Sequence, residues 1–342
     1  MEAIVLAGGF GTRLRPLTYT RPKSLLPLLN KPMILHLVEM LPQEVDTLVL
    51  AVNYRMKQIE DFFHDSNVGL DIIINNEPEP LGTGGATKFA EEHITGTFIT
   101  MNSDVVTDLA LEDILAFHRQ KGANGTISLW PVENVHEFGV VSLDDNGRID
   151  EFVEKPKPED APSNLINAGA YIMERHVLDM IPPGCFVSLE QEIFPKIIKT
   201  PQGFYGFNHG NYWVDVGRLS SYIDASVKLL ETEGLTKLLG QNCSLEGDMF
   251  KSTAGDDAEI GFGSQIVRSI LYDGVIIGKN CKVSNSIIGE GAIVGDSAIL
   301  QDVIVGDGEE IQPLAELSNE RVWTQEIPEG YPNKQIGNVV NK

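Results

Sequence analysis

The sequence has few of the features that mark several large classes of protein. Its cysteines are three in number and far apart, at Cys185, Cys243 and Cys281. Such cysteines favour neither a disulfide framework nor a zinc site, and they are typical of a reducing cytoplasm. No run of 18 apolar residues occurs, which excludes a membrane-spanning helix. The first expected strand begins by Ala3, so we expect no signal peptide.

Positive charge is also scarce. The chain holds 26 Lys and Arg residues against 49 Asp and Glu residues, for a formal net charge of −23. Residues 1–239 contain 19 cations against 33 acids, and residues 240–342 contain 7 against 16. Neither part is basic, so we expect no nucleic-acid partner and no anionic membrane surface.

The opening segment departs from this acidity. Residues 6–32 read LAGGFGTRLRPLTYTRPKSLLPLLNKP, and Glu2 is the one acid among the first 31 residues. A glycine-rich turn follows the strand expected at 3–7, and it lets backbone N–H groups approach an anion. The turn is surrounded by four cations: Arg13, Arg15, Arg21 and Lys23. This combination predicts a phosphate site, with a plain structural turn as the alternative.

Two common phosphate loops do not fit this turn. The segment contains no G-x-x-x-x-G-K-[ST] sequence, which excludes a Walker A loop. A dinucleotide fingerprint would need a third glycine after Gly9 and Gly11, where the chain has Leu14.

Residues 1–232 alternate short apolar runs with helical patterns, which predicts a mostly parallel sheet covered on both faces. We expect strands at 3–7, 47–52, 70–75, 97–101, 125–131, 138–143 and 167–173, and helices at 32–41, 55–65, 84–93, 110–121, 188–199 and 218–232. Ligands of such sheets bind at the carboxyl ends of the strands, where the glycine turn lies.

The pattern changes after an expected linker at 233–257. Aliphatic residues repeat every 17 positions in three registers: Ile260, Ile277 and Val294; Ile266, Val283 and Leu300; Leu271, Ile288 and Val305. This period predicts three stacked β-helical coils over 258–310, followed by a tail at 311–342 without a period. An antiparallel β-sandwich is the alternative. All seven histidines lie at or before His209, so the coils lack the histidine base of hexapeptide acyltransferases, and we interpret them as structural or oligomerising.

Seven segments together resemble the sugar-phosphate nucleotidylyltransferases, and within them the mannose-1-phosphate guanylyltransferases. They are the opening loop, EPLGTGG (79–85), NSD (102–104), FGVV (138–141), FVEKP (152–156), NAGAYI (167–172) and YWVDVG (212–217). The resemblance implies an α/β fold: a Rossmann-like catalytic domain over 1–232 with a mostly parallel mixed sheet, then a short left-handed parallel β-helix. It also implies transfer of a nucleotidyl group from a nucleoside triphosphate to a sugar 1-phosphate, with release of pyrophosphate.

The resemblance assigns roles to individual residues. It places the nucleotide on Leu6, Ala7, Gly8, Gly9, Gly11 and Thr12, with the base read by Gly82 and Thr83. Arg13 and Lys23 would hold the triphosphate, and Lys155 the sugar phosphate. The sugar would contact Gly139, Glu154 and Asn167. Asp104 and Asp215, which each end an apolar run, would bind Mg²⁺, since carboxylates are the hard ligands this ion prefers.

The sequence leaves several alternatives open. GTP and mannose 1-phosphate are the expected substrates, but a glucose-1-phosphate thymidylyl- or uridylyltransferase fits the same motifs. A non-catalytic regulator that binds nucleotide sugars is a further alternative. A short β-helix exposes apolar coil ends, so we expect a homo-oligomer.

Overall fold

The computed structural model describes residues 1–208, 210–329 and 331. It divides into two compact units. The first unit contains Met1–Gly9 and His36–Trp213, and the second contains Phe10–Leu35 and the described residues from Val214 onward. The glycine turn is therefore split, because the chain leaves the first unit at Gly9 and joins the unit that holds the β-helix. We expected the whole range 1–232 to form one domain.

The first unit is built on a nine-stranded mixed sheet in the order β10-β9-β11-β6-β1-β4-β5, to which β8 and β12 are joined through β11. Strands β6, β1, β4 and β5 are parallel, whereas β11 runs antiparallel to β6 and β8. The strands are β1 (Glu2–Leu6), β4 (Thr47–Val52), β5 (Asp71–Asn76), β6 (Phe98–Asn102), β8 (Gly125–Pro131), β9 (Gly139–Leu143), β10 (Ile149–Glu154), β11 (Leu165–Met173) and β12 (Phe204–Asn208). The short β7 (Val105–Thr107) follows β6, and β13 (Trp213–Asp215) crosses the unit boundary.

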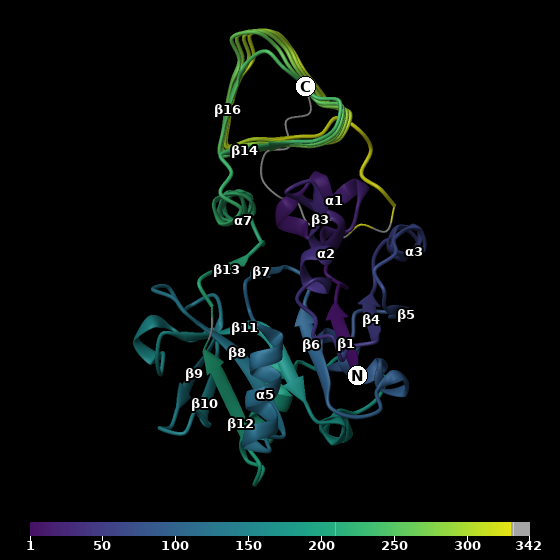
Figure 1. The fold of residues 1–342 in the computed structure, drawn as a ribbon, viewed down its shortest axis with the longest axis vertical. Coiled ribbons are helices and arrows are strands. Elements are labelled where there is room, and N and C mark those ends of the chain that lie inside the picture. Colours follow the sequence, from purple (N-terminus) through teal and green to yellow (C-terminus); the bar gives the residue numbers. More distant parts are fainter. Residues whose placement is uncertain (209, 330, 332–342) are drawn as a thin grey trace. The chain divides into compact units, whose positions relative to one another are not determined.

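Helices cover this sheet. They are α3 (Met56–Asp65), α4 (Gly82–Phe89), α5 (Leu111–Lys121) and α6 (Phe194–Ile198), while α2 (Met33–Val38) crosses the unit boundary. Helix α4 contacts β1. Helix α5 contacts β8, β11 and β12 (Figure 1). Both faces of central strands such as β1 and β4 are covered, and Ile4 and Val49 are fully buried. These strands are therefore continuous apolar runs.

The second unit begins with the opening segment, which forms α1 (Leu17–Thr20) and a small hairpin of β2 (Pro27–Leu28) and β3 (Lys31–Pro32). Helix α7 (Leu219–Thr232) leads into a β-helix of three parallel sheets (Figure 1). Its strands are β14 (Lys237–Leu239), β15 (Ser244–Leu245), β16 (Asp248–Phe250), β17 (Ser252–Ala254), β18 (Glu259–Ile260), β19 (Gln265–Val267), β20 (Ile270–Leu271), β21 (Ile276–Ile277), β22 (Lys282–Ser284), β23 (Ile287–Ile288), β24 (Ile293–Val294), β25 (Ile299–Gln301), β26 (Ile304–Val305), β27 (Glu310–Ile311), β28 (Glu316–Ser318) and β29 (Arg321–Val322).

The β-helix is longer than the sequence period suggested. Strands β14–β17 occupy the range expected as a linker, and β27–β29 continue past residue 310. The 17-residue period did not predict the first coil, because two of its pairings have a different spacing. Leu239 pairs with Ala254 and Leu245 pairs with Ile260, an offset of 15 instead of 17 residues. The last coil keeps the spacing through Ile311, Leu317 and Val322, which pack in the same core. Residues 332–342 of the expected tail lie outside the described residues.

Across the part of the chain that the structure describes, no helix is long and apolar enough to cross a membrane.

Candidate functional site

The glycine turn begins where the central strand of the first unit ends. The Ala7 N–H donates to the Ala51 carbonyl at 2.8 Å, which continues the parallel pairing of β1 and β4 for one residue beyond Leu6. Gly8 follows beside Glu77, since a Cβ built on it would lie 3.3 Å from Glu77 Oε1. Gly9 is exposed, with open space around its Cα. The turn therefore presents backbone at the carboxyl edge of the sheet, as the sequence predicted.

Glu77 is a buried carboxylate beside this turn that sequence reasoning missed. It follows β5 directly, and its Oε2 accepts a hydrogen bond from the Leu81 N–H at 3.0 Å. Burial raises the pKa of Glu77, and the bond from Leu81 opposes that shift. Glu77 thus links the glycine turn to the turn that precedes α4. One signal could have found it: it ends a strand at the same sheet edge as Gly8.

Gly82 and Thr83 open α4 and face a neighbouring backbone segment. A Cβ on Gly82 would lie 2.6 Å from the Val187 carbonyl oxygen, so this position must be glycine. The Thr83 hydroxyl donates to Glu190 at 2.7 Å and accepts from the Leu189 N–H at 2.9 Å. These contacts hold the turn against residues 187–190, and the base-reading role of Gly82 and Thr83 stays a prediction.

Three of the residues expected to bind the sugar or its phosphate come together at β9 and the end of β10. Gly139 and Glu154 are paired across the two strands, and the next residue, Lys155, places its Nζ 3.3 Å from Glu154 Oε1. The Lys155 side chain is 63% exposed and that of Glu154 is 20% exposed. Burial raises the pKa of Glu154, although the neighbouring ammonium opposes the shift. A reachable cation therefore stands beside a half-buried carboxylate.

Asn167 lies on β11, where the strand pairing is irregular. Its Oδ1 accepts the Gly169 N–H, and its Nδ2 donates to the Tyr171 hydroxyl, each at 2.9 Å. The Tyr171 hydroxyl is buried, which raises its pKa, and the nearby charges of Glu190 and Glu154 add to the shift. Glu190, a second residue that sequence reasoning missed, bonds to Thr83, and its charge also raises the pKa of Tyr171 and Glu154.

Asp104 stands in the tight turn between β6 and β7. The Ser103 N–H donates to the Leu6 carbonyl at 3.2 Å, so this turn adjoins the end of β1. The expected placement of Asp104 at the carboxyl end of a strand is therefore what the structure has.

The remaining site residues lie in the second unit. Gly11 has a left-handed backbone, with φ of +61°, and it precedes a short turn at Thr12–Leu14. Lys23 is 9% exposed and packs against Gly11, because a Cβ on Gly11 would lie 3.1 Å from Lys23 Cβ. Arg13 is exposed. A Cβ on Gly217 would lie 3.1 Å from Arg13 Nη2 and 3.3 Å from Asp215 Oδ1, so Arg13 and Asp215 flank the same glycine.

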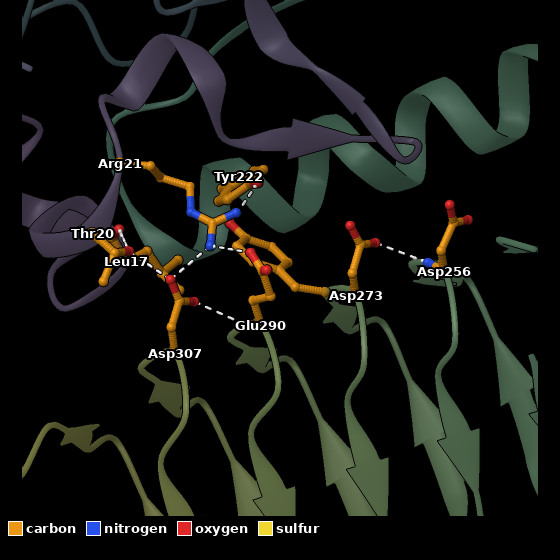
Figure 2. Close-up of polar contacts among 9 residues, drawn as sticks. Leu17, Thr20, Arg21, Tyr222, Asp256, Asp273, Glu290 and Asp307 are labelled. Carbon is orange, nitrogen blue, oxygen red and sulfur yellow. Dashed lines mark hydrogen bonds and ion pairs between the residues drawn. The ribbon is translucent and has the colours of Figure 1, made fainter. Parts of the chain in front are cut away.

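The other two cations of the opening segment have different surroundings. The Arg15 guanidinium lies 4.5 Å from the ring centroid of Tyr331. Arg21 forms ion pairs with Asp307 and Glu290 of the β-helix, and Figure 2 shows its side chain directed toward them. Arg15 and Arg21 therefore interact with Tyr331 and with acidic residues of the β-helix, and the phosphate role of Arg13 and Lys23 stays a prediction.

The two expected metal ligands, Asp104 and Asp215, belong to different units. Among residues 1–208, 210–329 and 331, no three His, Cys, Asp or Glu side chains are grouped as a metal site. Asp104 lies in the turn after β6 and Asp215 ends β13. Both are carboxylates, and such hard oxygen donors fit Mg²⁺ when phosphate and water oxygens complete the shell.

Two family models match consecutive parts of the chain. Residues 2–232 match a family model described as "Nucleotidyl transferase", and residues 236–322 match one described as "GlmU-like, C-terminal hexapeptide". The chain belongs to the nucleotidyl transferase family. The expected fold class, a Rossmann-like α/β domain followed by a left-handed β-helix, is confirmed.

Curated relatives of this family member include mannose-1-phosphate guanylyltransferases. Mannose-1-phosphate guanylyltransferase 1 of Arabidopsis thaliana is 41% identical over 231 residues, which is 65% of this chain and 63% of the relative. The match thus spans less than two thirds of that relative's length. The mannose-1-phosphate guanylyltransferase of Mycobacterium tuberculosis is 35% identical over 291 residues, which is 80% of each chain.

Solved structures share the fold of about two thirds of this chain. HddC from Yersinia pseudotuberculosis, also solved as a complex with GMP-PN, is 27% identical, with TM-scores of 0.56 and 0.55 over 67% of this chain and 99% of its own. A UDP-glucose pyrophosphorylase complexed with UDP-glucose has a TM-score of 0.60 at 23% identity, over 68% of this chain and 98% of its own.

Proposed function

We propose that this chain transfers the guanylyl group of GTP to mannose 1-phosphate, forming GDP-mannose and pyrophosphate, and that it requires Mg²⁺. The observation that carries the proposal is the match to the Mycobacterium tuberculosis guanylyltransferase, which extends over 80% of both chains. The local chemistry supports it, because an exposed Lys155 beside Glu154 offers a cation for a sugar phosphate and an acceptor for a sugar hydroxyl.

The proposed reaction needs no general base. An oxygen of the sugar phosphate is already ionised near neutral pH, since the second pKa of a phosphate monoester is about 6. That oxygen forms a bond to the α-phosphorus while the bond to the β-phosphate oxygen breaks and pyrophosphate leaves. The protein must therefore position two polyanions and neutralise their charge.

Each named residue has a part in this scheme. Lys155 would hold the sugar phosphate, and Glu154 and Asn167 would bind sugar hydroxyls. Arg13 is exposed and can reach the triphosphate, while Lys23 would act from beside Gly11. Asp104 and Asp215 would hold Mg²⁺, which when bound neutralises charge on the phosphates.

A substrate panel tests the proposal. Purified protein with Mg²⁺ is combined with GTP, ATP, UTP or dTTP and with mannose, glucose or galactose 1-phosphate, and pyrophosphate release is measured. We expect the highest kcat/KM for GTP with mannose 1-phosphate. A preference for dTTP or UTP with glucose 1-phosphate would replace the substrate assignment, and no turnover with any pair would favour a nucleotide-sugar-binding regulator.

Substitution of Asp104 tests the metal assignment. Asp104→Asn should reduce turnover at least 100-fold at saturating Mg²⁺ while the free energy of unfolding is retained. Asp113→Asn, which changes an exposed carboxylate on α5, is the matched control and should leave turnover intact. Unchanged turnover in Asp104→Asn would remove this residue from the metal site.

We also propose that the protein acts in the cytoplasm as a homo-oligomer. Three free cysteines suit a reducing compartment. The β-helix exposes large apolar side chains, with Phe250 50% and Phe262 66% accessible, and such surfaces favour association. Light scattering coupled to size-exclusion chromatography should give a mass at least twice 37.5 kDa, and a monomer mass would refute the assembly.

A further inference from the structure

The opening segment is held by the β-helix through a charged contact. Arg21 Nη2 donates to Asp307 Oδ2 at 2.6 Å and to Glu290 Oε2 at 2.7 Å (Figure 2). The Thr20 hydroxyl lies 2.5 Å from the same Asp307 oxygen. Burial lowers the pKa of Arg21, but Asp307 and the hydrogen bonds outweigh it, so the net shift is upward. Arg21 thus forms its ion pairs with the β-helix instead of binding a phosphate.

The two oxygens of Asp307 have different partners. Its Oδ1 accepts the backbone N–H of Glu290 at 2.8 Å, which joins neighbouring coils, whereas Oδ2 receives the opening segment. Asp273, two coils earlier at the equivalent position, makes the same coil-to-coil bond with the Asp256 N–H at 2.8 Å (Figure 2). Among the described residues, the ion pairs of Arg21 go to Asp307 and Glu290 and not to Asp273. Asp273 is therefore an internal control.

A second contact comes from Tyr331, which follows the last coil. Its hydroxyl lies 2.8 Å from the Phe10 carbonyl oxygen and 2.9 Å from Thr18 Oγ1, and Thr18 Oγ1 lies 3.0 Å from the Gly11 carbonyl oxygen. Two hydroxyl protons serve these three contacts, so two of the hydrogen bonds form at any one time. Tyr331 therefore contacts the Phe10 carbonyl directly and the Gly11 carbonyl only through Thr18.

The Tyr331 ring adds apolar and cation–π contacts to the hydrogen bonds. It packs edge-to-face against Phe10 and Tyr19, with centroid distances of 5.9 Å and 4.9 Å. The Arg15 guanidinium covers its face at 4.5 Å. The ring would retain these contacts if the hydroxyl alone were removed, which separates the hydrogen bonds from the packing.

We propose that Asp307 and Tyr331 are positioning residues for the nucleotide site, and that the β-helix through them holds residues 10–21 in the conformation that binds the triphosphate. This inference rests on the proposed function. The residues they hold include Gly11 and adjoin Arg13, which are proposed to bind nucleotide. The proposed sugar residues Glu154, Lys155 and Asn167 belong to the other unit. Loss of either contact should therefore weaken the binding of nucleotide and leave that of sugar phosphate unchanged.

The test compares two pairs of matched variants of the full chain. Asp307→Asn removes the charge that Arg21 needs but keeps an Oδ1 acceptor for the Glu290 N–H, and Asp273→Asn makes the same change where Arg21 has no ion pair. Tyr331→Phe removes one hydroxyl and keeps the ring. Tyr205→Phe is its control, because no hydrogen bond of the Tyr205 hydroxyl exists among the described residues.

The KM values for GTP and for mannose 1-phosphate are measured separately, along with kcat and the free energy of unfolding. We expect the GTP KM to rise about tenfold in Asp307→Asn and about three- to tenfold in Tyr331→Phe, as loss of one hydrogen bond predicts. The mannose 1-phosphate KM should change less than twofold, and both controls should match the wild type. An unchanged GTP KM in both variants, equal effects of Asp273→Asn and Asp307→Asn, or a parallel rise in both KM values would overturn the proposal.

Amide hydrogen exchange keeps this test independent of the assigned reaction. Exchange over residues 10–21 should be faster in Asp307→Asn and Tyr331→Phe than in their controls. A wild type that is inactive with every substrate pair would refute the proposed function, and exchange would still decide whether the contacts hold the segment. An active wild type with unaltered exchange and unaltered GTP KM in the variants would refute the positioning role alone.

Discussion

Gly11 offers the sharpest test of how this chain builds its nucleotide loop. Its φ of +61° lies in the left-handed region, which costs a residue with a Cβ about 1–2 kcal/mol. In Gly11→Ala the new methyl would also lie 2.8 Å from Thr18 Cγ2 and 3.1 Å from Lys23 Cβ, whereas carbon atoms prefer about 3.5–4.0 Å. Thr18 cannot rotate away without losing its bond to the Gly11 carbonyl.

These terms together give a cost of about 2–3 kcal/mol for the loop conformation seen here. If the substituted loop prefers another conformation by that amount, the fraction of protein that can bind GTP falls, and the GTP KM should rise about 30- to 150-fold. The assay varies GTP at saturating mannose 1-phosphate and follows pyrophosphate release. Unfolding in urea is measured alongside, to show that the variant is folded.

Gly122→Ala is the matched control for this prediction. Gly122 ends α5 with a φ of +57°, and a Cβ there would have nothing within 4 Å. It therefore carries the left-handed cost alone, far along the chain from the loop. We expect it to lower the free energy of unfolding by about 1 kcal/mol and to leave the GTP KM unchanged. A GTP KM within twofold of wild type in folded Gly11→Ala, or an equal rise in Gly122→Ala, would refute the reasoning.

Two further predictions concern the first unit. Lys155→Met removes the cation beside Glu154 and should raise the mannose 1-phosphate KM about 10- to 100-fold, since a hydrogen bond to a charged group contributes about 1.5–3 kcal/mol. Lys157→Met, at an exposed position, is the control. Equal effects of the two substitutions on this KM would contradict the assignment. His118 is 1% exposed, and burial lowers its pKa, although Glu174 opposes the shift. Its folded pKa is below the unfolded value of about 6.5, so the unfolded state takes up the proton first and stability is lost as the pH falls below that value. Urea unfolding between pH 7.5 and 5.5 should show a smaller loss for His118→Gln than for the wild type, and identical slopes would count against this interpretation.

Much of the fold of the first unit could be predicted from local pattern. The buried parallel strands β1 and β4 are apolar runs, and β4 has the bounds expected for it. Two strands of the nine-stranded sheet were missed, because β10 reads IDEFVE and β12 reads FYGFN. Neither has a clear apolar period, and each forms by pairing with a distant strand, β9 or β8.

The candidate site was predicted less completely. Family motifs led to Lys155, Glu154 and Gly139, which the structure brings together. Glu77 and Glu190 were missed because a single acid has no distinctive local pattern, whether it follows a strand, as Glu77 does, or lies in a short helical turn, as Glu190 does. Their importance comes from burial beside the glycine turn and from contact with Thr83, which only the folded chain creates.

The sequence by itself determined that the chain carries a glycine-rich turn among cations, an α/β sheet and a β-helix. Glycine placement, strand patterning and a 17-residue period are local or periodic properties, so they can be read from the order of residues. Tertiary structure alone decided what the cations of the opening segment do. Arg13 and Arg21 look alike in sequence, yet Arg13 is exposed while Arg21 is paired with Asp307, 286 residues away. A charge takes its role from the partners that surround it after folding, and the sequence does not state which coil of a β-helix will lie beside a given arginine.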